Sequence, residues 1–254
     1  MQRRPGFPAR LGGVSGVPAG PVRPAGAVHT PPISRGVGLD SAAVRARMVH
    51  RLGAGGIAAP AVLRAMGEVQ RHLFVDSALA NQAYEDPSLP IGLGQTISKP
   101  SVVARMIELL LDSVGARAAG LGRVLEIGTG SGYPAAVLAR VAREVYSLER
   151  LRALHEKART HLRPLRLANV HLILGDGMQG YPGGAPYAGI ISAAGTDQLP
   201  AQWCEQLAVG GRLVAPMARE GGQQRLLVVD KTLHGLQHNV LEAVHFVPLK
   251  SGIA

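Results

Sequence analysis

The sequence predicts an α/β fold, a doubly wound and mostly parallel sheet of seven strands with helices on both faces and a helical segment in front of it. The first observation is Arg123–Tyr133, RVLEIGTGSGY, in which a short apolar strand ends at a glycine-rich turn that leads into a helical pattern. The second is that strand and helix patterns alternate from there to residue 216. The last two strands lack a helical pattern between them, so we expect them to pair antiparallel at one edge.

Residues 1–39 are rich in proline, glycine and arginine, contain no acidic residue and show no hydrophobic periodicity. Such a segment cannot bury enough apolar surface to offset the entropy of ordering, so we expect a disordered leader. Residues 40–254 are expected to form a single domain. Within it, residues 40–120 supply helices and a substrate loop, and residues 121–254 supply the cofactor-binding sheet.

Three helices are expected before the glycine turn. The first begins at Asp40–Ser41, where an N-cap residue precedes apolar positions at helical spacing, and the second follows Pro60. The stretch 83–100, AYEDPSLPIGLGQTISKP, is too rich in turn residues to be regular and too apolar to be a linker. A long structured loop of this kind is usually functional. It ends at Ser98–Pro100, where the third helix is expected to begin. The residues after Pro100 form a wide apolar stripe at helical spacing.

The elements expected after the glycine turn form one alternating series. In order they are a helix over 134–142, a strand over 144–148, a helix over 151–161, strands over 170–174 and 189–192, a helix over 199–207, and strands over 211–216, 224–230 and 241–247. In open sheets of this kind, ligands bind at the carboxyl ends of the strands, near the point where the strand order reverses.

Composition excludes several classes of function. Half of the net charge of +10 lies in the five arginines of residues 1–39, and with 4% aromatic residues the chain lacks the interleaved rings and cations that bind nucleic acid. No apolar run reaches the length of a membrane span, about 18 residues, and the single cysteine, Cys204, fits a reducing compartment. No metal site is expected, because Gly235 interrupts the spacing of His234 and His238 and no third ligand is evident. We therefore expect a cytoplasmic protein without nucleic-acid or membrane partners.

Three acidic residues stand at the ends of consecutive predicted strands. Glu149 comes 23 positions after Glu126, close to the interval at which an acid reaches ribose hydroxyls in nucleotide-binding units. Asp176, followed by Gly177, is expected beside an adenine. The glycine turn has the form E-x-G-x-G-x-G, whereas the dinucleotide fingerprint would need its third glycine where Tyr133 stands.

These features resemble class I S-adenosylmethionine-dependent methyltransferases, whose fold is Rossmann-like, and within them the protein-L-isoaspartate O-methyltransferase family. The matching pieces are AMGEVQRHLFV (65–75), AYEDPSLPIGLGQTISKP (83–100), VLEIGTGSGYPAAVLA (124–139), VYSLER (145–150), GDG (175–177), QLAVGGRLVAPM (206–217) and FVPL (246–249). The specific signal is GQTISKP, because many methyltransferases share the glycine motif. The chain departs from the family at Gln70, usually proline, and at Ala188–Gly189, usually aspartate.

The resemblance implies methyl transfer from S-adenosylmethionine, which becomes S-adenosylhomocysteine, to the free α-carboxylate of L-isoaspartyl residues in damaged proteins and peptides. The enzyme is expected to be a monomer. The catalytic residue that the resemblance implies is Ser98, whose hydroxyl orients the acceptor carboxylate. The implied cofactor-binding residues are Glu126, Gly128, Thr129, Gly130, Ser131, Gly132, Glu149, Asp176 and Gly177. The implied substrate-binding residues are Gln95, Thr96, Ile97, Ser98, Ala193 and Ala194.

Three alternatives stay open in the sequence. Ser98 lies two residues before Pro100 and also has the position of a helix N-cap. The acceptor of the same fold is alternatively a small molecule or a nucleic acid, although Ser192–Gly195 stands where methyltransferases of base amino groups have an N/D-P-P-Y/F motif. A non-enzymatic cofactor-binding module would show damage in the glycine turn or at Ser98, and neither is seen.

Overall fold

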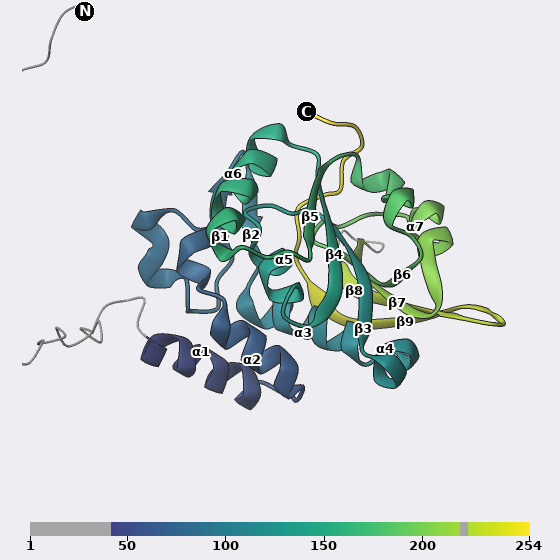
Figure 1. Ribbon diagram of the computed structural model, residues 1–254, viewed down its shortest axis with the longest axis horizontal. Coiled ribbons are helices and arrows are strands. Elements are labelled where there is room, and N and C mark those ends of the chain that lie inside the picture. The colour runs from purple at the N-terminus through teal and green to yellow at the C-terminus, as the bar shows by residue number, and fades with distance from the viewer. Residues whose placement is uncertain (1–41, 219–222) are drawn as a thin grey trace, which may run out of the picture. The chain divides into compact units, whose positions relative to one another are not determined.

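In a computed structural model of the protein, a seven-stranded sheet organises the residues that the structure describes, 42–218 and 223–254. The predicted leader over 1–39 lies outside the described residues. The strand order is β5-β4-β3-β6-β7-β8-β9 (Figure 1). The strands are β3 (Leu121–Ile127), β4 (Ala142–Glu149), β5 (Val170–Leu174), β6 (Tyr187–Ser192), β7 (Leu207–Ala218), β8 (Gln224–Thr232) and β9 (Gly235–Val244).

The directions of the strands confirm the predicted fold class. The strands β3 to β7 pair parallel with one another, whereas β8 pairs antiparallel with both β7 and β9. The predicted antiparallel pair at one edge is therefore present. Because β4 and β5 lie on one side of β3, and β6 and β7 on the other, the strand order reverses between β3 and β6. In an open α/β sheet, that reversal marks the expected ligand site.

Both faces of the sheet are buried, as a doubly wound fold requires. Successive residues of a strand point to opposite faces, and Val124 belongs to one apolar cluster while Leu125 belongs to the other. In β8, Val228 belongs to the first of these clusters and Val229 to the second. The helices that cover the sheet and extend its N-terminal side are α1 (Ala42–Ala54), α2 (Pro60–Glu68), α3 (Pro100–Leu111), α4 (Val114–Ala119), α5 (Tyr133–Leu138), α6 (Arg152–Leu162) and α7 (Ala201–Gln206).

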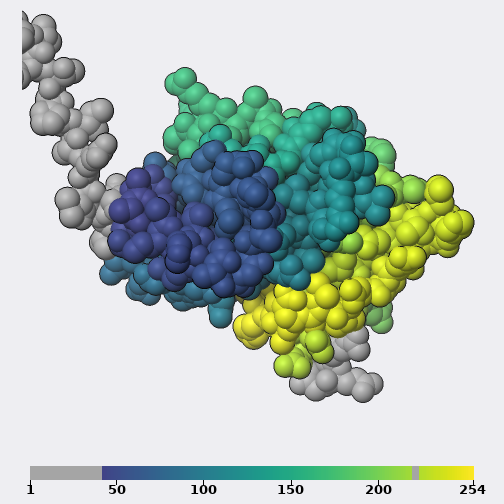
Figure 2. All heavy atoms as spheres, turned by 90° about the horizontal axis from the view of Figure 1, so that it is seen from below, coloured from purple at the N-terminus to yellow at the C-terminus, as the bar shows by residue number. Residues whose placement is uncertain are grey.

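The N-terminal helices are part of the same body as the sheet. Figure 2 shows α1 and α2, in purple and blue, beside the teal helices, with the yellow C-terminal strand on the same face. Met48 and Leu52 of α1 and Met66 of α2 belong to the apolar cluster that also contains Val124 of β3. Among the described residues, no helix combines the length and apolarity that crossing a membrane requires.

The prediction of an irregular loop over 83–100 was wrong in its centre, because β1 (Leu89–Gly92) and β2 (Gln95–Ile97) form an antiparallel hairpin there. The side chains of β1 alternate between buried and exposed, which is the period of a strand. The tight turn at Gly92, Leu93 and Gly94, whose φ angles are 100°, 53° and 67°, makes this stretch read as a loop in the sequence.

Other boundaries differ for similar local reasons. The helix predicted over 134–142 ends at Leu138, and residue 142 already begins β4. The last strand was predicted over 241–247 but begins at Gly235 and ends at Val244. Because β9 is an edge strand with mostly exposed side chains, its first half lacks the apolar pattern that the prediction required.

Candidate functional site

The glycine turn lies at the carboxyl end of β3, where the strand order reverses. Gly128, Gly130 and Gly132 have φ angles of 90°, 56° and 95°, which residues with a side chain rarely adopt. A Cβ on Gly130 would lie 3.2 Å from the Cδ1 atom of Ile91 in the β1–β2 hairpin. The glycine therefore lets the hairpin approach the main chain closely and form a roof over this turn.

A cavity of about 80 Å³ lies under this roof. Its walls come from Gly128 and Gly130, from residues 149–151 at the end of β4, from the hairpin and from residues 247–250 near the C-terminus. Ligand sites commonly enclose about 300–1,000 Å³. In this structure the cavity is therefore smaller than a typical cofactor site.

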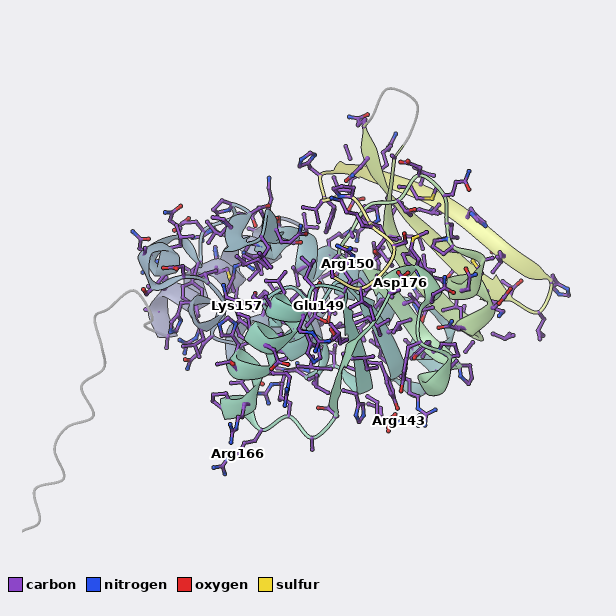
Figure 3. The ribbon with its side chains drawn as sticks, turned by 90° about the horizontal axis from the view of Figure 1, so that it is seen from above. Arg143, Glu149, Arg150, Lys157, Arg166 and Asp176 are labelled. Atoms are coloured by element: carbon purple, nitrogen blue, oxygen red, sulfur yellow. The ribbon has the colours of Figure 1, made fainter. Side chains whose placement is uncertain are left out.

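Glu149 places a carboxylate in the wall of this cavity and is only 5% exposed. Its Oε2 atom accepts a hydrogen bond from Gly130 N at 2.9 Å, and its Oε1 atom accepts one from Leu151 N at 2.9 Å. Each oxygen keeps a lone pair for a further donor. Figure 3 shows Glu149 near Arg150 and Asp176, with Arg143 at the opposite end of β4.

Asp176 is held differently from the expectation of an adenine-binding acid. Its Oδ1 atom accepts from Met178 N at 2.9 Å, and its Oδ2 atom accepts from Gly252 N at 2.7 Å. It is not among the residues that line the cavity, whereas Gly177 is. A Cβ on Gly177 would lie 2.6 Å from Ile127 Cγ2, so only glycine fits there. In this structure, Asp176 anchors the C-terminal segment that closes one side of the cavity.

Glu126 lies inside β3 rather than at its end, and it is 1% exposed. The Ser147 hydroxyl donates to its Oε2 atom at 2.5 Å and lies 2.6 Å from the Thr129 hydroxyl. Its Oε1 atom is buried without a hydrogen-bond partner among the described residues. Burial, with the nearby charge of Glu149, raises the pKa of Glu126 to about 8 against the opposing hydrogen bond from Ser147. At neutral pH this carboxyl is mostly protonated.

This raised pKa predicts how the stability of the protein depends on pH. Below the unfolded value of 4.5, both states hold the proton. Between pH 4.5 and about 8, the unfolded chain releases a proton that the folded chain keeps, so wild type loses stability by up to about 1.4 kcal/mol per pH unit. Glu126→Gln removes this loss. Denaturant unfolding from pH 5 to 9 is expected to show the variant gaining stability relative to wild type up to about pH 8 and no further.

Glu156→Gln is the matched control for this prediction, because Glu156 is an exposed acid that pairs with Arg159 on α6. Its stability curve should run parallel to that of wild type over the same pH range. A Glu126→Gln curve that also stays parallel to wild type would contradict the raised pKa.

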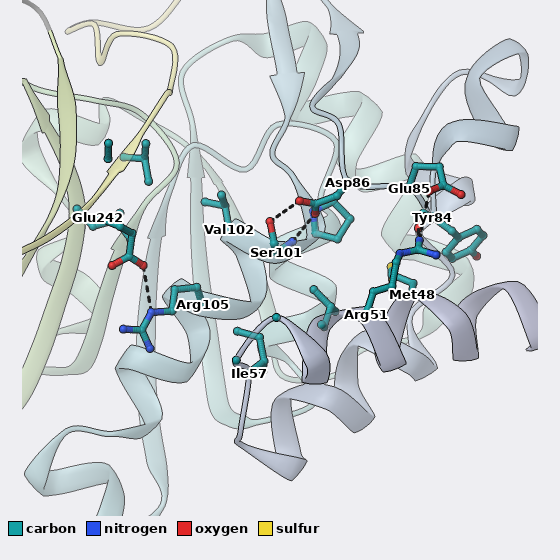
Figure 4. Close-up of a pocket in the computed structure, with 17 residues that line it drawn as sticks. Met48, Arg51, Ile57, Tyr84, Glu85, Asp86, Ser101, Val102, Arg105 and Glu242 are labelled. Carbon is teal, nitrogen blue, oxygen red and sulfur yellow. Dashed lines mark hydrogen bonds and ion pairs between the residues drawn. The ribbon is translucent and has the colours of Figure 1, made fainter.

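Ser98 lines a second and smaller cavity, of about 20 Å³, together with Glu126, Ala193 and Phe246, and the surface of this cavity is apolar. The structure overturns the reading of Ser98 as a helix cap. The N-cap residue of α3 is Lys99, without a side-chain bond, and Asp86 accepts from the Ser101 backbone N–H at 2.8 Å (Figure 4). The Ser98 hydroxyl thus forms no hydrogen bond within residues 42–218 and 223–254.

The other predicted site residues divide into three groups. Gln95, Thr96 and Ala194 line the larger cavity, and Ala193 lines both cavities. Ile97 is buried in the core next to them. The side chains of Thr129 and Ser131 are turned into the protein, and Gly132 packs against Leu162, so these three residues shape the loop from behind.

Sequence reasoning missed two side chains of α6 that hold this region together. The Lys157 ammonium donates to Ile91 O at 2.8 Å and fastens the hairpin roof to α6. The Nδ1 atom of His161 donates to Ser131 O at 2.9 Å and fixes the glycine turn. Nothing in the amphipathic pattern of α6 distinguishes these positions. Residues 247–250 of the cavity wall could have been found from the sequence, because they overlap FVPL (246–249), one of the pieces that resemble the methyltransferase family.

A larger hollow of about 670 Å³ lies between α1, α3 and β9 (Figure 4). Four of its charged side chains form two ion pairs. Arg51 contacts Glu85 at 3.4 Å, and Arg105 contacts Glu242 at 3.1 Å. None of the predicted site residues lines it. In the part of the chain that the structure describes, no group of histidine, cysteine, aspartate and glutamate side chains could hold a metal ion.

Comparison with known proteins agrees with this geometry. Residues 43–254 match the family model described as protein-L-isoaspartate(D-aspartate) O-methyltransferase. The protein-L-isoaspartate O-methyltransferase of Methylibium petroleiphilum is 55% identical over 266 residues, which cover 98% of this chain and 96% of the relative. That of Leptothrix cholodnii is 57% identical over 243 residues, which cover 93% of this chain and 85% of the relative.

Two solved structures have the same fold. One protein-L-isoaspartate O-methyltransferase superposes with a TM-score of 0.73 at 30% identity, covering 82% of this chain and 67% of that chain. A Plasmodium falciparum protein, described as a β-aspartate methyltransferase in complex with S-adenosyl-L-homocysteine, superposes with a TM-score of 0.67 at 24% identity. It covers 81% of this chain and 98% of that chain.

Proposed function

Because this chain belongs to the protein-L-isoaspartate O-methyltransferase family, we propose that its two adjoining cavities are the cofactor half and the acceptor half of one methyl-transfer site. The single observation that carries this assignment is that Ala193 lines both cavities. One cavity is built by the glycine turn and Glu149, and the other by Ser98 and Glu126. The two halves thus meet at the carboxyl ends of β3 and β6.

The reaction is the methylation of the free α-carboxylate of an isoaspartyl residue, which begins repair of the damaged protein. S-adenosylmethionine supplies an electrophilic sulfonium methyl group and leaves as S-adenosylhomocysteine. A carboxylate oxygen bonds to the methyl carbon as the carbon–sulfur bond breaks, and no proton is transferred. Since carboxylates are ionised at neutral pH, the protein needs no strong general base. Its task is to align the reactants and exclude water.

The residues of the larger cavity fit the cofactor. Gly128 and Gly130 present bare main chain to the cavity, and a side chain at Gly130 would have a strained backbone and a tight contact with Ile91. The free lone pairs of Glu149 suit two ribose hydroxyls. Gly177 lines the same cavity and is assigned to the adenine side, with Asp176 positioning it from behind.

The residues of the smaller cavity fit the acceptor. Ser98 offers a hydroxyl without a partner in the described chain, beside the apolar side chains of Val103, Met106 and Phe246. A hydrogen bond from this hydroxyl orients the acceptor carboxylate toward the methyl group. Gln95, Thr96, Ile97, Ala193 and Ala194 are assigned to the walls around the acceptor.

Ser98→Ala is therefore expected to lower turnover on an isoaspartyl peptide by about 10- to 100-fold, since a neutral or charge-assisted hydrogen bond contributes about 1–3 kcal/mol. The affinity for S-adenosylmethionine should stay nearly unchanged. Turnover is measured as S-adenosylhomocysteine release, and affinity by calorimetry.

Ser101→Ala is the matched control, because it removes a hydroxyl three residues further along the chain. That hydroxyl donates to Asp86 at 2.6 Å and faces the separate hollow beside α1. Turnover of this variant should stay close to that of wild type. Equal turnover in Ser98→Ala and wild type would remove Ser98 from the acceptor site.

The cellular setting follows from the family and the sequence. We assign the protein to the cytoplasm and to isoaspartyl proteins and peptides as partners. Residues 40–254 are taken as one catalytic domain that acts as a monomer. Gel filtration with light scattering tests the oligomeric state.

A further inference from the structure

The hairpin roof of the larger cavity needs support from outside its own two strands. These strands have four and three residues, and an isolated two-stranded hairpin is marginally stable in water. The register also shifts between Pro90 and Gly92, so Ile91 has no partner residue in β2. A bulge of this kind re-aims a side chain next to a site. Here the Ile91 side chain is 3% exposed and lines the cavity.

The support at this bulge comes from α6. The Lys157 ammonium donates to Ile91 O at 2.8 Å, so the donor reaches the residue that the hairpin register leaves out (Figure 3). The bond is partly buried, where a carbonyl that loses its donor is poorly compensated by water. Lys157 therefore fixes how far Ile91 projects over the glycine turn, where a Cβ on Gly130 would lie 3.2 Å from its Cδ1 atom.

The same face of α6 also holds the floor of the cavity. His161 follows Lys157 by four residues, which places both side chains on one face of the helix. The Nδ1 atom of His161 lies 2.9 Å from Ser131 O in the glycine turn. Leu154, three residues before Lys157, lines the cavity directly. One helix face thus fixes the hairpin relative to the glycine turn.

We propose that Lys157 is a positioning residue for the cofactor, because it keeps the bulged Ile91 in place as a wall of the larger cavity. The proposal rests on the proposed function, in which this cavity is the cofactor half of the site. Without the ammonium, the free hairpin also populates arrangements in which Ile91 has left the wall. The apparent affinity for the cofactor then falls with the fraction of protein that is competent to bind. A bound cofactor restores the arrangement, so the chemical step keeps its rate.

Lys157→Met tests this proposal, because methionine keeps an unbranched stem and lacks the donor. Calorimetry is expected to show S-adenosylhomocysteine binding about 5- to 10-fold more weakly than in wild type. The KM for S-adenosylmethionine should rise by a similar factor, whereas kcat on an isoaspartyl peptide at saturating cofactor should stay within about twofold. Lys157→Arg, which brings back a charged donor, should recover most of the affinity.

Lys231→Met is the matched control. The Lys231 ammonium donates to Cys204 O at 2.8 Å, so this variant also loses a lysine–carbonyl hydrogen bond, and Lys231 does not line the cavity. Its affinity for S-adenosylhomocysteine should stay within about twofold of wild type. Unchanged affinity in Lys157→Met, an equal loss in Lys231→Met, or a Lys157→Arg variant as weak as Lys157→Met would overturn the proposal. Wild type that binds no S-adenosylhomocysteine would instead contradict the proposed function.

Hydrogen exchange followed by mass spectrometry tests the same contact without any ligand. In Lys157→Met, the backbone amides of residues 91–97 are expected to exchange at least about fivefold faster than in wild type. Lys231→Met should leave them unchanged, and the buried strand β3 should exchange equally in all three proteins. Equal exchange of the hairpin in Lys157→Met and wild type would overturn the proposal, even in a preparation that binds no cofactor. A rise of the same size in β3 would assign Lys157 to the stability of the whole domain and would overturn it as well.

Discussion

An isoaspartyl peptide is expected to be methylated at least about 100-fold faster than the aspartyl peptide of the same sequence. In the isoaspartyl form, the main chain runs through the side-chain carboxyl group, which leaves the α-carboxylate free and lengthens the backbone by one methylene. A normal aspartyl carboxylate stands on a different stem and misses the methyl group that the site aligns. A misplacement of about 1 Å at the reacting atoms costs about 100-fold.

The measurement compares transfer of a labelled methyl group to the two peptides. An isoasparaginyl peptide, which keeps the altered backbone but replaces the carboxylate with an amide, is the matched control and should receive no methyl group. The product of the isoaspartyl peptide should be base-labile, as an ester is. Equal rates on the two acidic peptides, or a base-stable product, would favour the small-molecule acceptor that the sequence left open.

Glu149→Ala is expected to weaken the binding of S-adenosylmethionine by about 100-fold or more. Each hydrogen bond from a ribose hydroxyl to the carboxylate contributes about 1.5–3 kcal/mol, and about 1.4 kcal/mol corresponds to tenfold. In the wild type, Gly130 N and Leu151 N donate hydrogen bonds to this carboxylate, and the substitution leaves both without that acceptor. The loss should therefore appear in affinity for the cofactor, measured by calorimetry, before it appears in the affinity for the peptide.

Glu156→Ala provides the charge-matched comparison for that variant. It removes one acid from the exposed surface of α6, where Glu156 pairs with Arg159, and should leave the affinity for S-adenosylmethionine within about twofold of wild type. Unchanged affinity in Glu149→Ala would place the ribose elsewhere in the cavity.

The parts of the fold that sequence could predict are those with a clear apolar run or alternation. The edge strand β5, whose apolar side chains are partly buried, has its predicted bounds, Val170–Leu174, and the parallel series and the antiparallel edge are as expected. The β1–β2 hairpin was missed because a turn of Gly92, Leu93 and Gly94 interrupts two very short strands. The helix α4 was missed because six residues, VGARAA, show too little periodicity.

For the candidate site, sequence reasoning predicted which residues lie near the strand ends but not the direction of their side chains. Glu149 and Asp176 look alike as acids after a strand, yet Glu149 lines the cavity and Asp176 holds Gly252, 76 positions away along the chain. A contact between residues so far apart along the chain leaves no signal in the local sequence pattern. The spacing of the glycine turn also gave no sign that Glu126 is buried with one oxygen unpartnered in the described residues, because that depends on the packing around β3 and on Ser147 from the neighbouring strand.

The hairpin roof has a consequence for the order of events in a catalytic cycle. Thr96 in β2 lines the larger cavity, and Ser98, the first residue after β2, lines the smaller one, so one short stretch of chain serves both halves of the proposed site. Lys157 fastens the other strand of the same hairpin. If the roof lifts to admit the cofactor, Ser98 is expected to move with it, and a peptide already in place would obstruct that motion. We therefore expect an ordered cycle, in which the methyl donor enters first, the damaged chain second, the ester departs, and the spent donor leaves last.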